Sequence, residues 1–353
     1  MPYCKALYNH LFVDVQGYYS PCCFYTEKKQ YHYTDMSWKD FHKSEYMERI
    51  RDNMKTGWDE GCNDCKQLED QNLPSYRNVV DGYCKSDIPK IEFIEISCNN
   101  SCNIRCRMCN QNFSSKWAET LNIEVSGIKN FEKFLSEIDT TDLKIVKYLG
   151  GEPFITPEIK ILFDWMLTLP NPVKFYCNTN LTLFPNKYLD TLKSFEKVII
   201  GYSIDGTELV NDYIRQDSKW DIVKTNLEKW EDFKRECNID SYVHTTVQAY
   251  NFHNLKKIKT FCDEYSLFHS AFKIFGPDEF TLNSLPPDYI NTYTDDYNIK
   301  FLNDYKYDQT LHTKLKETTE KQDKLLKNKL QDYIPEMNNG IWTKSFRPLR
   351  EPS

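Results

Sequence analysis

The sequence predicts an α/β fold in which six strands form a parallel sheet that curls into a partial (β/α)6 barrel. Strand-like and helix-like runs alternate over residues 89–276, and such alternation implies parallel strands joined by right-handed crossovers. The chain has 353 residues, which is enough for roughly two domains with a buried core. The expected strands cover residues 91–96, 143–149, 173–177, 198–204, 242–249 and 271–275.

The first strand and two of the connecting helices have the clearest patterns. Apolar and charged residues alternate over 91–96, as expected of a strand. Pro157 is expected to start a helix, because proline is favoured in a first turn and apolar side chains recur on one face as far as Met166. A second amphipathic helix is expected from Trp220 to Trp230. These helices supply the crossovers that a parallel sheet needs.

Two flanking regions differ in character from the barrel, which is assigned to residues 89–279. Residues 1–88 form a cysteine-rich unit, in which Ser37 is expected to cap a helix that continues through Met54. Residues 280–353 form a helical C-terminal extension with a charge-rich helix over 310–333. Its last part, residues 342–353, is expected to cover the open side of the barrel or its base.

Composition and charge exclude several classes of protein. The net charge is -7, so nucleic acid is not an expected partner, because phosphate binding needs an excess of Lys and Arg on one face. The N-terminus lacks a signal-peptide pattern, and the absence of a long apolar run argues against a membrane span. Thirteen cysteines are too sparse for a small disulfide scaffold, and their odd number does not pair off. We therefore expect free thiols and a reducing cytoplasm.

Three thiols follow the first strand closely, at Cys102, Cys106 and Cys109. They lie on a loop at a strand's C-terminal end, where sites gather in barrels and open parallel sheets. A structural zinc site needs four ligands and no histidine lies nearby, although Cys98 could supply a fourth thiolate. An iron-sulfur cluster held by only three thiolates would instead leave one iron open to a small molecule.

The C-x3-C-x2-C arrangement on this loop resembles the cluster motif of the radical S-adenosylmethionine (radical SAM) superfamily, whose fold is a partial TIM-type barrel. The resemblance implies a 4Fe-4S cluster whose open iron takes the amino and carboxylate groups of SAM. One electron then splits the sulfonium, and the resulting 5'-deoxyadenosyl radical removes a hydrogen atom from a substrate. The family usually has an aromatic residue before the last cysteine, and Met108 stands there in this chain.

The second strand is followed by Gly150-Gly151-Glu152, and a Gly-Gly pair before proline is by itself an ordinary turn. Two adjacent glycines also let the backbone approach a ligand, while a carboxylate accepts from an ammonium group. Sixty residues after the cysteine loop, this segment resembles the GGE motif of radical SAM enzymes. The resemblance implies that Glu152 binds the amino group of SAM.

Polar residues also follow the third and fourth strands. Asn180 matches the family's Thr-Asn-Gly segment, with Leu181 in place of the glycine. The interval from Ser203 to Arg215 resembles one in SPASM and Twitch enzymes, where the serine and arginine hold the carboxylate of SAM. A surface ion pair of Arg215 with neighbouring acids is nearly as good an interpretation. The full set of expected SAM-binding residues is Gly150, Gly151, Glu152, Asn180, Ser203, Asp205 and Arg215.

A second group of thiols lies in the N-terminal unit, at Cys4, Cys22, Cys62 and Cys65. The spacing alone fits a structural zinc site about as well as an iron-sulfur cluster. The surrounding residues resemble the Twitch module, the shortened form of SPASM, which implies an auxiliary iron-sulfur cluster of the 4Fe-4S type. Cys22 fits the G-x4-C pattern of this module better than Cys23. In most relatives the module follows the barrel, whereas here it precedes it.

The sequence thus predicts a radical SAM enzyme with an auxiliary cluster. Its expected partners are a peptide, protein or small-molecule substrate and a reductase or flavodoxin-type electron donor, and no catalytic acid or base is assigned. One alternative is a radical SAM enzyme that acts on a sugar or alcohol and binds zinc at its N-terminal thiols. The alternative from another class is a zinc-binding interaction protein, which leaves the Gly-Gly-Glu segment and the barrel pattern unexplained.

Overall fold

The computed structural model describes residues 3–27, 31–71, 73–86, 88–125 and 127–337. Within these ranges a nine-stranded sheet runs in the order β11-β10-β8-β7-β6-β4-β1-β2-β3, and β5 and β9 form a separate pair. The strands lie at β1 His10–Val13, β2 Tyr18–Ser20, β3 Tyr31–His32, β4 Phe93–Ser97, β5 Arg105–Cys106, β6 Ile145–Leu149, β7 Lys174–Thr179, β8 Lys197–Ser203, β9 Arg215–Gln216, β10 Ile239–Val247 and β11 Phe268–Lys273.

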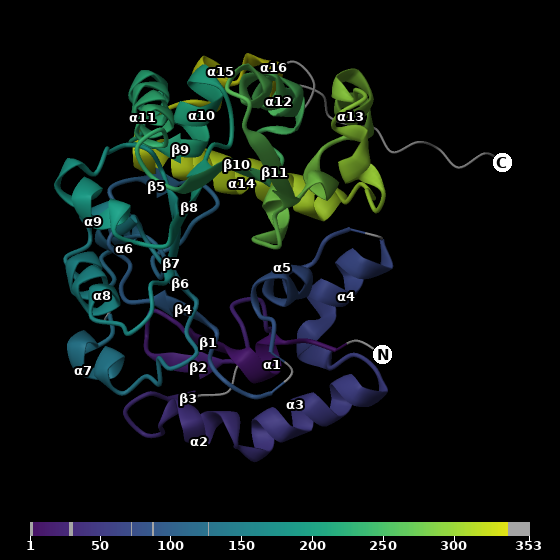
Figure 1. Cartoon of the computed structure of the whole chain (residues 1–353). Helices are drawn as coiled ribbons and strands as arrows, with labels where there is room; N and C mark the ends of the chain where they lie inside the picture. Colours follow the sequence, from purple (N-terminus) through teal and green to yellow (C-terminus); the bar gives the residue numbers. More distant parts are fainter. Residues whose placement is uncertain (1–2, 28–30, 72, 87, 126, 338–353) are drawn as a thin grey trace.

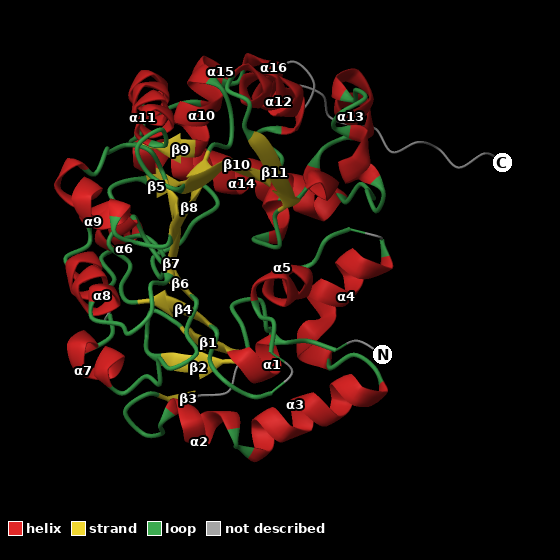
Figure 2. Ribbon diagram, in the orientation of Figure 1, coloured by secondary structure: helices red, strands yellow, loops and turns green. Residues whose placement is uncertain are grey.

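The six expected strands correspond to β4, β6, β7, β8, β10 and β11, with ends shifted by a few residues. All five neighbouring pairs among them are parallel. Figure 2 shows the strands following a curved path with α7, α8, α9 and α11 on its outer side. The predicted α/β class and the mostly parallel, curled sheet are therefore confirmed.

The N-terminal unit adds strands to this sheet, which the sequence did not predict. β1 pairs in parallel with β4, so that Leu11 lies opposite Ile94 and Phe12 opposite Glu95. β2 and β3 continue the sheet with antiparallel pairing. The cysteine-rich unit and the barrel consequently share one hydrogen-bonded sheet (Figure 1).

Two helices replace the one expected after Ser37. Ser37 caps the first helix by accepting a hydrogen bond from Asp40 N, and Ser44 caps the second by accepting from Met47 N. The break occurs at Lys43 and Ser44 because a serine at this point can begin a new helix. The helices of this unit are α1 Ala6–Asn9, α2 Trp38–His42, α3 Glu45–Thr56, α4 Asn63–Asp70 and α5 Tyr76–Tyr83, with a 3-10 turn η1 Glu60–Cys62.

The helices that connect the barrel strands begin close to the expected positions. α8 begins at Glu158 with Pro157 as its N-cap, and α11 begins at Trp220. Both bury the apolar faces that the sequence predicts. The helices of this region are α6 Ser115–Leu121, α7 Phe131–Ser136, α8 Glu158–Leu167, α9 Leu189–Lys193, α10 Glu208–Ile214, α11 Trp220–Phe233 and α12 Leu255–Glu264, with 3-10 turns η2 Pro153–Ile155, η3 Asn186–Tyr188 and η4 Phe252–Asn254.

The C-terminal region is helical, as predicted, but its long helix is interrupted. It ends at Leu326, because Lys327 takes the left-handed conformation with φ 57°. The expected cover formed by residues 342–353 lies outside the described residues. No helix in the described ranges combines the length and the apolar character that a membrane crossing requires. The elements are η5 Asp278–Phe280, η6 Leu282–Ser284, α13 Pro287–Tyr293, η7 Ile299–Leu302, α14 Gln309–Leu326, α15 Leu330–Tyr333 and α16 Pro335–Met337.

A buried ion pair links the first two barrel strands. Lys147 Nζ lies 2.7 Å from Glu95 Oε1, and His10 Nε2 lies 3.1 Å from Glu95 Oε2. Lys147 also lies over the rings of Tyr76 and Tyr176. Burial favours the neutral forms of Glu95 and Lys147, but the attraction between their opposite charges outweighs this effect. It keeps the pKa of Glu95 below its usual value and that of Lys147 above its usual value.

The Lys147→Met substitution tests this pair. It should lower the free energy of unfolding by about 3–5 kcal/mol, because it leaves a buried carboxylate without its strongest partner. The matched control is Lys160→Met, since Lys160 forms an exposed ion pair with Asp164 on α8. Urea denaturation should show a clear loss for the first variant and little change for the second. Equal midpoints for the two variants would contradict the assignment.

Candidate functional site

The three-thiol loop is held between β4 and α10. Cys102 N donates to Ser115 Oγ at 3.0 Å, at the start of α6. The loop then forms β5, in which Cys106 lies opposite Arg215 of β9. Cys109 N donates to Cys106 O at 3.0 Å, which closes a tight turn. The expected cluster loop and the expected SAM-binding arginine are therefore direct neighbours.

Arg215 supplies a buried positive charge at this site. Its Nη1 lies 3.8 Å from Cys106 Sγ, and its Nε lies 2.9 Å from Asp205 Oδ2. Burial raises the pKa of the Cys106 thiol, while the guanidinium acts in the opposite direction. The surface ion pair considered as an alternative for Arg215 is not formed, since the side chain is buried and pairs with Asp205.

Glycine is needed at both positions after β6, because the backbone of another segment of the chain packs closely against them. Gly150 has φ 114°, a conformation that side chains disfavour. A Cβ on Gly151 would lie 1.9 Å from Ser101 O, and Glu152 N donates to the same oxygen at 2.7 Å. The backbone that approaches these glycines is thus the segment just before Cys102, so the Gly-Gly pair positions the cysteine loop.

Glu152 joins the second and third strand ends. Its carboxylate accepts 2.8 Å hydrogen bonds from Thr179 Oγ1 and from Asn180 N. Asn180 Nδ2 in turn donates to Asn103 Oδ1 in the cysteine loop at 3.0 Å. Burial raises the pKa of Glu152 to about 7, against the effect of these hydrogen bonds. The carboxyl therefore lies in an environment where a cationic partner would favour its ionised form.

Leu181 adopts the left-handed backbone conformation that a glycine at this position would adopt without strain. It has φ 59°, which is strained for a branched side chain. The side chain is fully buried, and Leu181 O accepts from Asn226 Nδ2 at 2.8 Å. Packing and this hydrogen bond offset the strain, so the departure from the Thr-Asn-Gly pattern leaves the turn intact.

Ser203 and Asp205 lie at the end of β8 as expected. Ser203 is half-buried and lies opposite His244 of β10. Asp205 Oδ1 accepts from Thr246 N at 2.8 Å, so the carboxylate ties β8 to β10 as well as to Arg215. Thus Cys106, Arg215 and Asp205 form one connected group, and Glu152 and Asn180 form another around Asn103 of the same loop.

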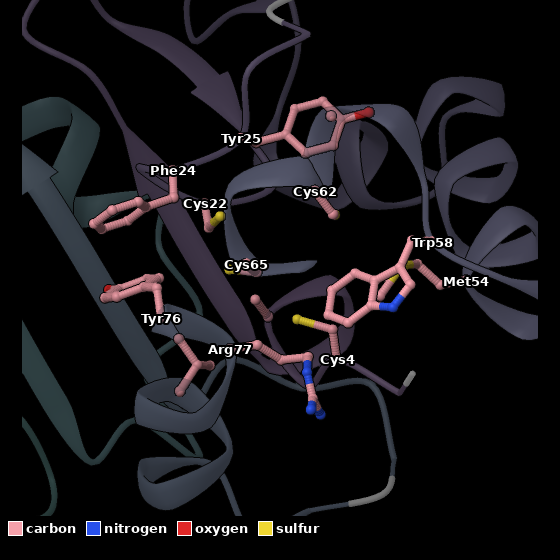
Figure 3. A pocket seen from close by; sticks show the side chains of 13 residues that line it. Cys4, Cys22, Phe24, Tyr25, Met54, Trp58, Cys62, Cys65, Tyr76 and Arg77 are labelled. Carbon is pink, nitrogen blue, oxygen red and sulfur yellow. The ribbon is translucent and has the colours of Figure 1, made fainter. Parts of the chain in front are cut away.

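The four N-terminal thiols line one pocket. Figure 3 shows Cys4, Cys22, Cys62 and Cys65 around one space, together with aromatic side chains such as Trp58. Three distant segments bring them together: the start of the chain, the turn after β2, and the start of α4. Burial raises the pKa of Cys4 and Cys22, and the neighbouring thiols of the group raise it further.

Cys22 and Cys23 point into different environments. Cys22 lines the pocket, and it lies close enough to Cys4, Cys62 and Cys65 for their negative charge to raise its pKa. Cys23 instead lies beside Glu95, Lys147 and Tyr76, in the buried ion-pair network of the barrel. The structure thus places Cys22 in the candidate ligand set, and it places Cys23 between the pocket and the barrel interior.

The donor sets at both sites fit iron-sulfur chemistry. Thiolates are the ligands that such clusters prefer, and the pocket offers four of them within a buried, largely apolar wall. Among the described residues, no three Cys, His, Asp or Glu side chains lie close enough together to bind a single metal ion, whereas each thiolate of a cubane cluster binds a different iron. Cys98, the possible fourth ligand of the barrel loop, is buried beside Tyr148.

Two features of the site were missed at the sequence level. Glu95 and Lys147 were assigned no partner, because their pairing depends on the register between strands about fifty residues apart. Arg107 lies between two of the expected ligands and is fully buried, with its charge paired to the C-terminal helix α14. The position of an arginine within the cysteine motif is a signal, but its partner lies too far along the chain to be inferred.

The pair Cys22→Ala and Cys23→Ala tests the assignment of the pocket. After anaerobic reconstitution, the Cys22 variant should lose iron from the pocket, because a pocket ligand is missing. The Cys23 variant should keep its iron, since that side chain lies outside the pocket. Iron and sulfide analysis, together with the visible absorption of the cluster, provides the measurement. Loss of iron only from the Cys23 variant would reverse the assignment. 

Comparison with known proteins supports the assignment of the N-terminal unit. Residues 4–66 match SPASM, an iron-sulfur cluster-binding domain. No curated protein matches the chain. Among solved structures, native anSMEcpe with bound AdoMet is similar at 18% sequence identity and a TM-score of 0.44, over 67% of this chain and 62% of that chain.

Two structures of SuiB from Streptococcus suis are also similar. The one bound to S-adenosylmethionine has 13% identity and a TM-score of 0.39, over 79% of this chain and 55% of that chain. The one bound to the precursor peptide SuiA has 13% identity and a TM-score of 0.42, over 84% of this chain and 55% of that chain. The chain therefore spans about 55 to 62% of the length of these proteins. The match of residues 4–66 to the SPASM iron-sulfur cluster-binding domain agrees with the resemblance of the cysteine pattern.

Proposed function

We propose that the chain is a radical SAM enzyme with an auxiliary iron-sulfur cluster. The observation that carries this proposal is the position of Cys102, Cys106 and Cys109 at the C-terminal end of β4, beside the buried guanidinium of Arg215. Three thiols and a buried cation suit a site that binds a cluster and the carboxylate of SAM. When bound, the cluster and SAM would supply a 5'-deoxyadenosyl radical that takes a hydrogen atom from the substrate.

The chain's own residues would hold and orient SAM. Arg215 is fixed by Asp205 with its guanidinium toward the thiols, which suits a carboxylate. Glu152 has a pKa near neutrality and lies at the next strand end, which suits an ammonium group. Gly150, Gly151 and Asn180 would act mainly by holding the loop against these residues, and Ser203 by adding a hydroxyl at the end of β8.

The N-terminal pocket would hold the auxiliary cluster with a full set of four thiolates, from Cys4, Cys22, Cys62 and Cys65. Four protein ligands leave no site for direct ligation of substrate. The pocket is joined to the barrel by the turn after β2, where Phe24 packs against Phe275 at 5.4 Å between ring centroids. We therefore infer a role in electron transfer, with residues 1–88, 89–279 and 280–353 as three units of one enzyme.

A peptide or protein is the proposed substrate, on the strength of the SPASM module, and a reductase or flavodoxin-type protein is the proposed electron donor. Free thiols at both sites require reducing conditions, which supports a cytoplasmic location.

SAM cleavage tests the proposed activity. Reduced, reconstituted protein should release 5'-deoxyadenosine from SAM, measured by liquid chromatography and mass spectrometry. The Cys106→Ala variant should fall to the background level, because one of only three ligands is lost. Cys237→Ala is the matched control, since Cys237 hydrogen-bonds to Leu192 O far from the loop, and it should keep the parent rate. No 5'-deoxyadenosine from the parent, and no difference for Cys106→Ala, would overturn the proposal.

Metal analysis separates the auxiliary cluster from a zinc site. If both clusters are of the cubane type, the parent should contain about eight irons per chain. The double variant Cys62→Ala/Cys65→Ala should lose about half of this iron. Unchanged iron together with bound zinc in the parent would instead favour a radical SAM enzyme with a structural zinc pocket. Zinc without sulfide at both sites would indicate an interaction protein.

A further inference from the structure

Arg107 is a fully buried arginine within the three-thiol loop, directly after Cys106. A buried guanidinium is costly unless it is paired with a charge and its donors are hydrogen-bonded. Its charged partner, Asp323, lies in the C-terminal extension, more than two hundred residues along the chain. The loop and the extension are therefore linked by an interaction that neither could satisfy alone.

The guanidinium is bonded on all sides. Nη2 donates to Asp323 Oδ1 at 2.7 Å and to Asn328 Oδ1 at 2.8 Å, and Nε donates to Tyr213 O at 3.0 Å. The group also lies 3.5 Å above the ring centroid of Tyr213. Ion pairing, hydrogen bonding and ring stacking together fix both the position and the plane of the side chain.

The backbone of Arg107 is also held by α10 and α14. Its N donates to Ile214 O at 2.8 Å, and its O accepts from Gln322 Nε2 at 2.9 Å. The residue between Cys106 and Met108 is thus fixed by α10 on one side and by α14 on the other. The side chain and the backbone of Arg107 are therefore both held by elements outside the loop.

Asp323 also organises the end of the helix. Its Oδ1 accepts from Tyr213 OH at 3.0 Å, and its Oδ2 accepts from Leu330 N at 2.7 Å. The turn at Lys327 returns the chain so that Asn328 reaches Arg107. The end of α14 at Leu326 therefore allows these contacts to form. An uninterrupted helix would carry Asn328 and Leu330 away from the Asp323 carboxylate.

We propose that Arg107 and Asp323 form a clamp through which the C-terminal helix α14 positions the Cys102–Cys109 loop for cluster binding. Arg107 is a positioning residue in this scheme, because it acts through the adjacent cysteines. The proposal rests on the proposed function only in assuming that these thiols hold a cluster. It assigns the C-terminal extension a task at the site, although α14 supplies none of the expected ligands.

The Asp323→Asn variant tests the clamp, because it removes the charge while keeping an oxygen acceptor. The control is Glu320→Gln, which removes a carboxylate from an exposed position of the same helix. Both are compared with the parent as full-length, anaerobically reconstituted protein. The measurements are iron per chain, the electron paramagnetic resonance spectrum after reduction, and hydrogen exchange of the peptide covering residues 102–109.

In Asp323→Asn, amide exchange over residues 102–109 should rise by about tenfold or more, because a charged hydrogen bond that holds the loop is weakened. Iron should fall by up to about half while the pocket cluster is retained. The Asn328→Asp change in the same background should restore much of both, since Asn328 Oδ1 already accepts a hydrogen bond from Arg107 Nη2 at 2.8 Å. If iron content and amide exchange recover when a carboxylate is restored at a neighbouring position, the effect of Asp323→Asn is one of positioning and not a general loss of stability.

Unchanged exchange and iron in Asp323→Asn would overturn the clamp. Equal iron loss from both sites, without recovery in the double variant, would also overturn it, because the effect would then be a general destabilisation. Exchange of the loop is measured without any SAM turnover. A parent protein that makes no 5'-deoxyadenosine would therefore count against the proposed function and leave this test intact.

Discussion

The contact between Arg215 and Asp205 is the interaction on which the rest of the candidate site depends. It is formed between the end of β8 and the short strand β9, and β9 is the partner of the cysteine-bearing strand β5. A buried cation needs a buried carboxylate, and each fixes the other's orientation. Lys147 is paired with Glu95, and Arg107 with Asp323, in the same way. Three paired charges thus hold the loop, the sheet and the C-terminal helix in one arrangement.

Much of the barrel could be predicted from the sequence, because its signals are local. The alternation in residues 91–96 and the apolar faces of α8 and α11 are patterns that a strand or helix needs wherever it lies. The cysteine spacing and the polar strand ends are local too, and parallel strands place their carboxyl ends at one edge of the sheet. The sequence alone therefore predicts that these site residues lie together at one edge of the sheet.

The remainder depends on distant partners and could not be predicted in this way. The strand β1 is uniformly buried, so no alternation marks it, and its pairing with β4 crosses about eighty residues. The break after Leu326 depends on the contacts that Asp323 makes with the returning chain. Helical periodicity continues through that point in the sequence, and only the tertiary contacts show where the helix must stop. The division between Cys22 and Cys23 likewise follows from the packing of a turn against the barrel.

The pairing of β1 with β4 has a consequence for biosynthesis. A ribosome delivers the N-terminal cysteines long before residues 93–97 emerge, yet β1 lies between β4 and β2 in the finished sheet. The edge of β1 that faces β4 is therefore unsatisfied until translation reaches the barrel. Assembly of the N-terminal unit is thus coupled to the start of the barrel. A nascent chain interrupted earlier would present unpaired backbone and free thiols to the cell's quality-control machinery.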